Sequence, residues 1–202
     1  MEYCILNLSE ESLNSPDRTI RKEFLLQTFN STDISTEKKI EVFKKALFDK
    51  HDSIRNLAIE YLSNIYEKSQ DFNFKDILIP ALEKESVWSV KYLILKKFSK
   101  YKLDMTNNKE FILKLTFELK PQVRIASAEV LLALPQEQQE DSYIDRLLEL
   151  WKDKDESVRK QLEILLSESE NPKIKKFMAE YEEKLAEKER KKKEIAGMFE
   201  GI

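Results

Sequence analysis

The stretch from His51 to Asn64 reads His-Asp-Ser-Ile-Arg-Asn-Leu-Ala-Ile-Glu-Tyr-Leu-Ser-Asn, and its apolar residues recur at helical spacing. Its core is an aliphatic residue followed by a basic one, and this core returns at Ile20-Arg21, Ile54-Arg55, Val90-Lys91, Val123-Arg124 and Val158-Arg159. Successive basic residues are 34, 36, 33 and 35 positions apart. A period of this length, carried by helical patterns, is typical of a solenoid of stacked helix pairs. The repeat therefore predicts the architecture and favours a function in binding.

The composition fits the same architecture. Charged residues make up 36% of the chain and hydrophobic residues 41%, with only 2 glycines, Gly197 and Gly201. Such a chain suits helices with charged outer faces, so we expect an all-α protein. The net charge of −3 argues against a general nucleic-acid binder, which usually carries a basic excess, but leaves a local basic patch open.

Alignment on the basic residue gives three apolar columns that keep their register over four repeats. They lie twelve positions before it (Phe43, Ile79, Ile112, Leu147), nine before it (Ala46, Leu82, Leu115, Leu150) and seven after it (Leu62, Phe98, Leu131, Leu166). The first repeat fits poorly in its first helix, as expected for a terminal cap. We expect about five helix pairs over residues 1–170.

These residues resemble the HEAT-repeat family, whose second helix typically opens with an acidic residue, Val-Arg, a small residue and Leu. The match is close at Asp52-Ser53-Ile54-Arg55 with Ala58 and Leu62, and at Asp155 to Arg159. The segment Ser86 to Lys91 departs most, with Lys for Arg and Trp88 for the acidic residue. The resemblance implies a right-handed α-solenoid of stacked helix pairs. It says little about function, because the family includes scaffolds, transport factors and a few enzymes.

A different pattern begins after residue 170. Asn171-Pro172 suits the start of a helix, and the apolar stripe from Ile174 to Leu185 can cover the open end of the stack. A charged stretch follows, and the tail turns apolar again at helical spacing, at Ile195, Met198, Phe199 and Ile202. We therefore expect residues 171–202 to form a capping helix and a charged C-terminal extension. Its apolar tail is a candidate docking peptide for a partner or a second copy of the chain.

Little in the sequence supports catalysis, a metal or a cofactor. His51 is the only histidine, so a histidine-rich metal site cannot form, and no Gly-rich phosphate loop or Ser/His/Asp set occurs. We expect a non-enzymatic protein with no catalytic residues, bound metal or cofactor. The only cysteine, Cys4, excludes an internal disulfide, and no apolar run of about 18 residues or signal peptide is present. These features predict a cytoplasmic protein without a membrane span.

The HEAT-like alkylpurine DNA glycosylases are the enzymatic relatives to weigh, since they use Trp, Asp and Arg on a basic concave face. Trp88 and Trp151 are the only tryptophans here, and neither belongs to a matching Trp-Asp group. The acidic balance also opposes binding to a phosphate backbone. A nucleic-acid-binding or glycosylase-like protein remains the alternative function.

Two groups of side chains are candidates for binding. The basic column, Arg21, Arg55, Lys91, Arg124 and Arg159, is more simply explained by hydrogen bonds to acidic or backbone acceptors at the inter-helix turns than by phosphate binding. A second candidate is an aromatic and basic cluster that suits a protein interface. It consists of Trp88, at a turn position, and of Tyr92, Lys96, Lys97 and Lys100 on the predicted helix that follows. We therefore expect a protein–protein interaction scaffold or adaptor. Its partner would dock on the concave face formed by the second helices, with the C-terminal tail as a second contact.

Overall fold

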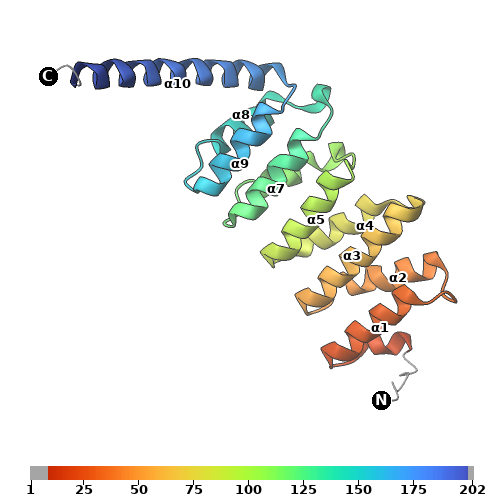
Figure 1. Ribbon diagram of the computed structural model, residues 1–202. Coiled ribbons are helices and arrows are strands. Elements are labelled where there is room, and N and C mark those ends of the chain that lie inside the picture. The colour runs from red at the N-terminus through yellow and green to blue at the C-terminus, as the bar shows by residue number, and fades with distance from the viewer. Residues whose placement is uncertain (1–8, 200–202) are drawn as a thin grey trace. The chain divides into compact units, whose positions relative to one another are not determined.

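The structure, a computed structural model, describes the backbone of residues 9–199 and the side chains of residues 9–192. All regular elements in this part of the chain are helical (Figure 1), and Cys4 and Ile202 lie outside it. No described helix holds an apolar segment long enough to cross a membrane. The chain divides into two compact units, Met1–Leu103 and Asp104–Ile202. The expected division at residue 170 stays a prediction.

The first unit contains two complete helix pairs and the second helix of the repeat before them. A short 3-10 helix, η1, takes the place of a first helix in that terminal repeat. The elements in order are η1 (Glu10–Asn14), α1 (Arg18–Asn30), α2 (Thr36–Ala46), α3 (Asp52–Ser69), α4 (Phe74–Lys84) and α5 (Trp88–Lys100).

The second unit contains two further pairs and a long final helix. Its elements are η2 (Thr106–Asn108), α6 (Lys109–Leu115), α7 (Pro121–Leu132), η3 (Gln136–Gln138), α8 (Asp141–Leu150), α9 (Glu156–Ser167) and α10 (Pro172–Phe199). The prediction of a helix that begins at Pro172 is confirmed. The Asn171 side chain accepts hydrogen bonds from the Lys173 and Ile174 amides, at 3.0 and 3.4 Å.

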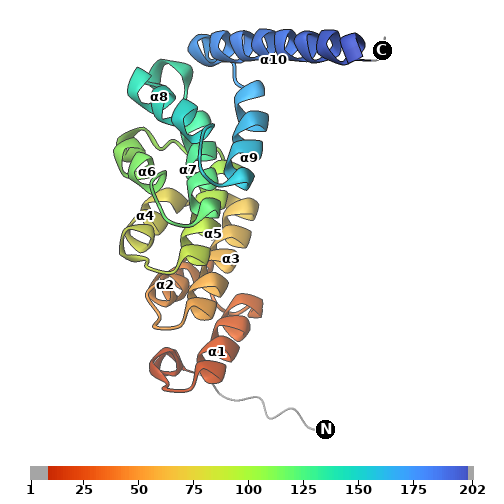
Figure 2. The ribbon, with the colours of Figure 1, turned by 90° about the vertical axis from the view of Figure 1, so that its left-hand side faces the viewer.

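Within each unit the two helices of a pair belong to different layers. Figure 2 shows α2 and α4 on one side of the first unit, with α3 and α5 on the other. In the second unit, α6 and α8 lie on one side and α7 and α9 on the other. The second helices of successive repeats therefore lie side by side and present one common face in each unit.

The three apolar columns form the core. All twelve of their residues are buried, from Phe43, Ile112 and Leu62 at 0% exposure to Ile79 at 8%. The predicted register is thus confirmed over four repeats. In the first repeat the third column continues as Thr28, which is buried although its Oγ1 has no hydrogen-bond partner in the structure. This mismatch lies in α1, the second helix of the terminal repeat, whereas the sequence had suggested a poor fit only in its first helix.

Turns in the first unit are built without glycine. Helix α3 ends at Gln70, whose φ of 53° lies in the left-handed region, and its amide donates to the carbonyl of Tyr66 at 3.0 Å. Lys102, just after α5, has a φ of 48°. A left-handed conformation costs a non-glycine residue roughly 1–2 kcal/mol, and the hydrogen bonds that end the helix help to offset it.

Candidate protein-binding surface

The arginines of the basic column are bound inside the fold. In the first unit, Arg21 donates two hydrogen bonds to the carboxylate of Asp49, at 2.6 and 3.0 Å. Arg55 does the same to Glu85, at 2.7 and 2.8 Å. In the second unit, Arg124 binds Asp153 at 2.9 and 2.8 Å. Each acceptor lies in the turn of the next repeat, so these pairs tie neighbouring repeats together.

Two of these acceptors, Asp49 and Asp153, also bind the following arginine through their backbone carbonyls. The carbonyl of Asp49 accepts from Nη1 of Arg55 at 2.8 Å, and that of Asp153 accepts from Nη1 of Arg159 at 2.6 Å. One acidic residue thus satisfies two guanidinium groups, one through its side chain and one through its main chain. This arrangement supports the structural explanation of the column and leaves these arginines poorly placed to bind phosphate.

Burial and ion pairing have opposite effects on the pKa of Asp153. Burial alone raises the pKa of Asp153, whereas the hydrogen bonds from Arg124 and from the Asp155 amide lower it, and the lowering prevails. Asp153 is therefore held in its charged form by the fold.

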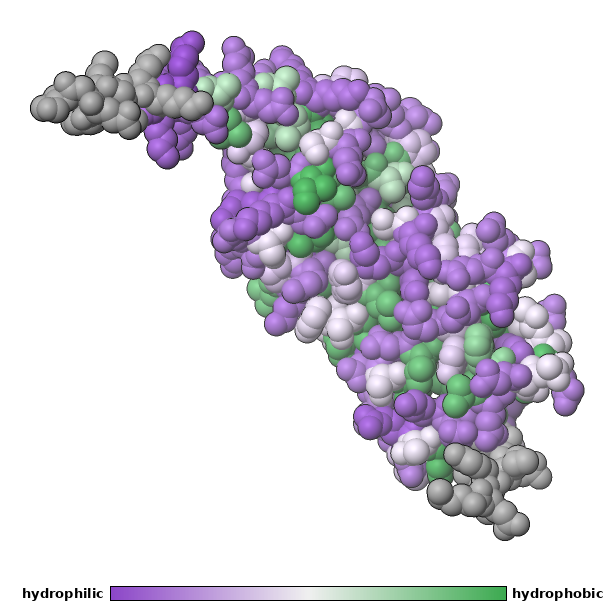
Figure 3. Space-filling view, in the orientation of Figure 1, coloured by the Kyte–Doolittle hydropathy of each residue, from purple (hydrophilic) through white to green (hydrophobic). Residues whose placement is uncertain are grey.

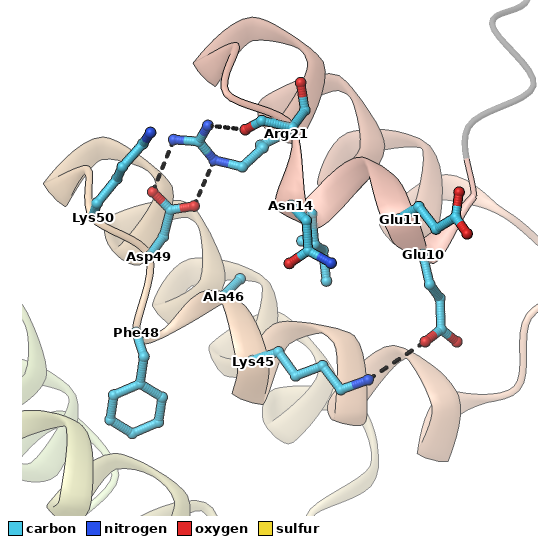
Figure 4. A pocket seen from close by; sticks show the side chains of 11 residues that line it. Glu10, Glu11, Asn14, Arg21, Lys45, Ala46, Phe48, Asp49 and Lys50 are labelled. Atoms are coloured by element: carbon cyan, nitrogen blue, oxygen red, sulfur yellow. Dashed lines mark hydrogen bonds and ion pairs between the residues drawn. The ribbon is translucent and has the colours of Figure 1, made fainter.

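A polar hollow of about 490 Å³ lies at the start of the first unit, between η1 and the end of α2 (Figure 4). Four of its charged groups are paired with one another, since Arg21 binds Asp49 and Lys45 binds Glu10 at 3.4 Å. A hydrogen bond from Lys38 lowers the pKa of the Glu10 carboxyl. These pairs fit a structural role better than a catalytic one.

The residues predicted to form a binding cluster lie on α5, but they divide into two sets. Trp88, Tyr92 and Lys96 are four positions apart and share one face of the helix. Trp88 is the first residue of α5 and is 40% exposed, while Tyr92 and Lys96 are half-buried.

The other two residues of the cluster contact α3. Lys97 Nζ lies 2.7 Å from Glu60 Oε2, and Lys100 forms an ion pair with Glu67. The hydroxyl of Tyr101 donates to the same Glu67 carboxylate at 2.7 Å. Lys97 and Lys100 therefore join two neighbouring second helices, and a partner would meet them as part of this charged seam.

Large apolar side chains remain exposed on other second helices as well. Leu26 of α1 is 39% exposed, and Ile164 of α9 is 52% exposed. In the view of Figure 3, hydrophobic patches stand apart within the mainly hydrophilic surface of each unit. Sequence reasoning missed Leu26 and Ile164, although each lies five positions after a basic residue of the column, on the outward face of its helix.

The last candidate, the C-terminal tail, is described only in part. Ile195, Met198 and Phe199 belong to helix α10, their side chains lie outside the described part of the structure, and Ile202 lies beyond it altogether. The role of the tail stays a prediction. Sequence reasoning also missed a cleft between α10 and Trp151, the residue that follows α8, which has an apolar wall and a lysine rim.

The described residues contain no group of three or more His, Cys, Asp or Glu side chains that could hold a metal ion. His51 is half-buried in the turn before α3.

Comparison with known proteins identifies the fold. No protein-family model matches the chain, and neither does any curated protein. Among solved structures, a designed armadillo repeat protein in complex with the peptide (KR)4 is similar, with a TM-score of 0.59 and 15% identity over 85% of each chain. A second designed armadillo repeat protein has a TM-score of 0.53 and 15% identity over 78% of this chain and 79% of that one. The predicted all-α repeat solenoid is thereby confirmed, and membership of the HEAT family stays a prediction.

Proposed function

We propose that the chain is a non-enzymatic, HEAT-like scaffold of the cytoplasm that binds a partner protein through the face that the second helices form in each of its two units. The observation that carries this proposal is the exposure of Leu26 and Trp88 on this face of the first unit, and of Ile164 on that of the second. Burying such side chains in the core would favour folding, whereas their exposure costs free energy that a bound partner can recover.

The chemistry of the face favours a protein over a nucleic acid. Apolar patches alternate with paired charges such as Lys97–Glu60, and a protein interface commonly has this mixed character. Nucleic-acid binding needs accessible cations, but Arg21, Arg55 and Arg124 are bonded to carboxylates inside the fold. The designed repeat protein that binds (KR)4 offers a precedent for a peptide ligand on this fold.

Within the face, Trp88, Tyr92, Lys96, Lys97 and Lys100 are the proposed centre of contact in the first unit. Trp88 supplies a broad apolar surface at its exposed edge. The lysines of α5 favour an acidic partner, because a partner carboxylate can add to or exchange with the Glu60 and Glu67 pairs.

The proposal is tested by purifying the tagged chain from its own host, cross-linking the captured proteins through lysine and mapping the links by mass spectrometry. We expect links to the partner at Lys22, Lys96 and Lys160, which lie on α1, α5 and α9. Lys44 and Lys114, on the first helices α2 and α6, serve as controls. Links confined to the control lysines would contradict the proposed face, and capture of nucleic acid alone would favour the alternative function.

A further inference from the structure

Only the start of α10 packs against the rest of its unit. Asn171, Ile174 and Met178 are buried, and the rings of Phe177 and Tyr181 meet Trp151 edge-on, with centroids 5.2 and 4.3 Å apart. From residue 182 to residue 192 every side chain is exposed. The helix therefore leaves the stack just after its aromatic contacts.

The departure of α10 leaves an open cleft of about 450 Å³ beside Trp151. Its apolar wall consists of Trp151, Phe177, Tyr181 and Leu185, and Leu185 is 40% exposed. This volume accommodates a large apolar side chain, which would be buried against the aromatic rings of the wall. None of the residues that line the cleft belongs to a second helix.

The charged residues around the cleft indicate which kind of ligand it would bind. Lys152, Lys184 and Lys188 border it, against a single carboxylate from Glu180. The rim is therefore basic in a chain whose net charge is −3. We propose that this cleft is a second docking site, which binds an acidic protein segment by inserting one bulky apolar side chain between Trp151 and Leu185.

Other occupants fit the cleft less well. The tail of the same chain cannot fold back, because α10 continues to Phe199 and a helix rises about 1.5 Å per residue, which carries Ile195 roughly 15 Å beyond Leu185. A second α10 docked antiparallel would bring the basic stretch of residues 188–193 close to its own copy, so like charges would oppose pairing. A nucleic acid would meet Glu180 at the cleft and five more glutamates on the same helix, at 182, 183, 187, 189 and 194.

The test uses the full chain with Trp88→Phe, which leaves Trp151 as the only tryptophan and so as a fluorescent reporter of the cleft. The probes are short synthetic peptides in which one Leu or Phe is flanked by Asp and Glu. One matched set has Lys in place of the acidic residues, and another has Ser in place of the apolar anchor. We expect the acidic, anchored peptides to bind and to change the Trp151 emission, and both matched sets to bind on the order of tenfold more weakly.

Two pairs of charge-reversing substitutions distinguish binding at the cleft from attraction by the overall charge of α10. Lys184→Glu with Lys188→Glu should weaken binding of the acidic peptides on the order of tenfold or more. Lys176→Glu with Lys192→Glu changes the net charge equally on the same helix at exposed positions outside the cleft, and should leave affinity within about twofold. All four substituted side chains are exposed, so thermal unfolding should confirm that both variants fold.

Several results would overturn the inference. The inference fails if no acidic peptide binds with a dissociation constant below about 1 mM. Equal loss in the two charge-reversed chains would assign binding to general charge rather than to the cleft. Displacement of the peptides by a single-stranded oligonucleotide, but by no excess of unlabelled peptide, would assign the site to nucleic acid. Self-association lost in Lys184→Glu with Lys188→Glu would assign it to a second copy.

Discussion

Arg124 and Asp153 lie 29 positions apart in the sequence, yet they form two hydrogen bonds of 2.9 and 2.8 Å across neighbouring repeats. Both side chains are largely buried, at 6% and 11% exposure. The same geometry recurs between Arg21 and Asp49 in the first unit. These bidentate pairs fix the spacing of successive repeats in a way that apolar contacts alone cannot, because a planar guanidinium donates two parallel hydrogen bonds only to a carboxylate that lies in a matching orientation.

Removal of one partner from the Arg124–Asp153 pair should therefore be costly. We expect Asp153→Ala to lower the free energy of unfolding by about 3 kcal/mol, since Arg124 is left buried without its carboxylate. Urea unfolding measures the loss. Lys160→Gln, which breaks an exposed pair with Glu156, is the control and should cost less than about 1 kcal/mol. Equal losses in the two variants would show that the buried pair has no special role.

The same pair makes stability depend on pH. The pKa of Asp153 is lower in the folded chain than its ordinary value, so the charged carboxylate stabilises the fold. This contribution to the free energy of unfolding is fully present when the pH is above the ordinary pKa, and it is lost as the pH falls through the pKa of the folded state. The gap in unfolding free energy between the wild type and Asp153→Asn should thus narrow as pH falls below about 4. Urea unfolding at neutral and acidic pH measures this, and a gap that widens on acidification would contradict the sign.

A substitution in the terminal repeat should stabilise the chain. Thr28 is 1% exposed, and its hydroxyl has no partner in the structure. Thr28→Val keeps the shape and removes the polar atom, so we expect a gain of about 1 kcal/mol in the free energy of unfolding. Thr36→Val, at the exposed start of α2, is the matched control and should give no gain. A destabilised Thr28→Val would mean that the hydroxyl has a partner after all.

The repeat architecture followed from the sequence because its cause is local and periodic. Residues such as Phe43, Leu62 and Leu131 recur at fixed distances from the basic column, and burial of one face of each helix explains all of them. The carboxylates that bind the arginines of the basic column were not predicted, because which acidic residue lies beside each arginine depends on where the turns lie in space. Even so, Asp49 and Asp153 each stand six positions before the next arginine, a signal that could have identified them.

The candidate site was less predictable, because exposure depends on what the neighbouring repeat supplies. Lys97 and Lys100 resemble free surface lysines in the sequence, but the stacking of α5 on α3 places Glu60 and Glu67 beside them. The cleft beside Trp151 was missed for a related reason. It exists because α10 leaves the stack, and the apolar stripe through Tyr181 and Leu185 predicts a packed cap equally well.

The C-terminal tail gives a prediction that separates binding from folding. All described residues of α10 from 182 to 192 are exposed, so the end of the helix contributes little to the stability of its unit. Deletion of residues 195–202 should leave the melting temperature unchanged and weaken association with the partner or with a second copy. A marked fall in melting temperature with unchanged association would make the tail part of the fold.

The central claim, that a partner docks on the second-helix face, is tested most directly by isothermal titration of the captured partner into matched aromatic variants. Trp88→Ala removes an exposed ring from this face, whereas Phe48→Ala removes a ring that is 51% exposed in the turn after α2. We predict a loss of roughly 2 kcal/mol in binding free energy for Trp88→Ala and almost none for Phe48→Ala. Unchanged affinity in Trp88→Ala, with affinity lost in Phe48→Ala, would contradict the proposed face.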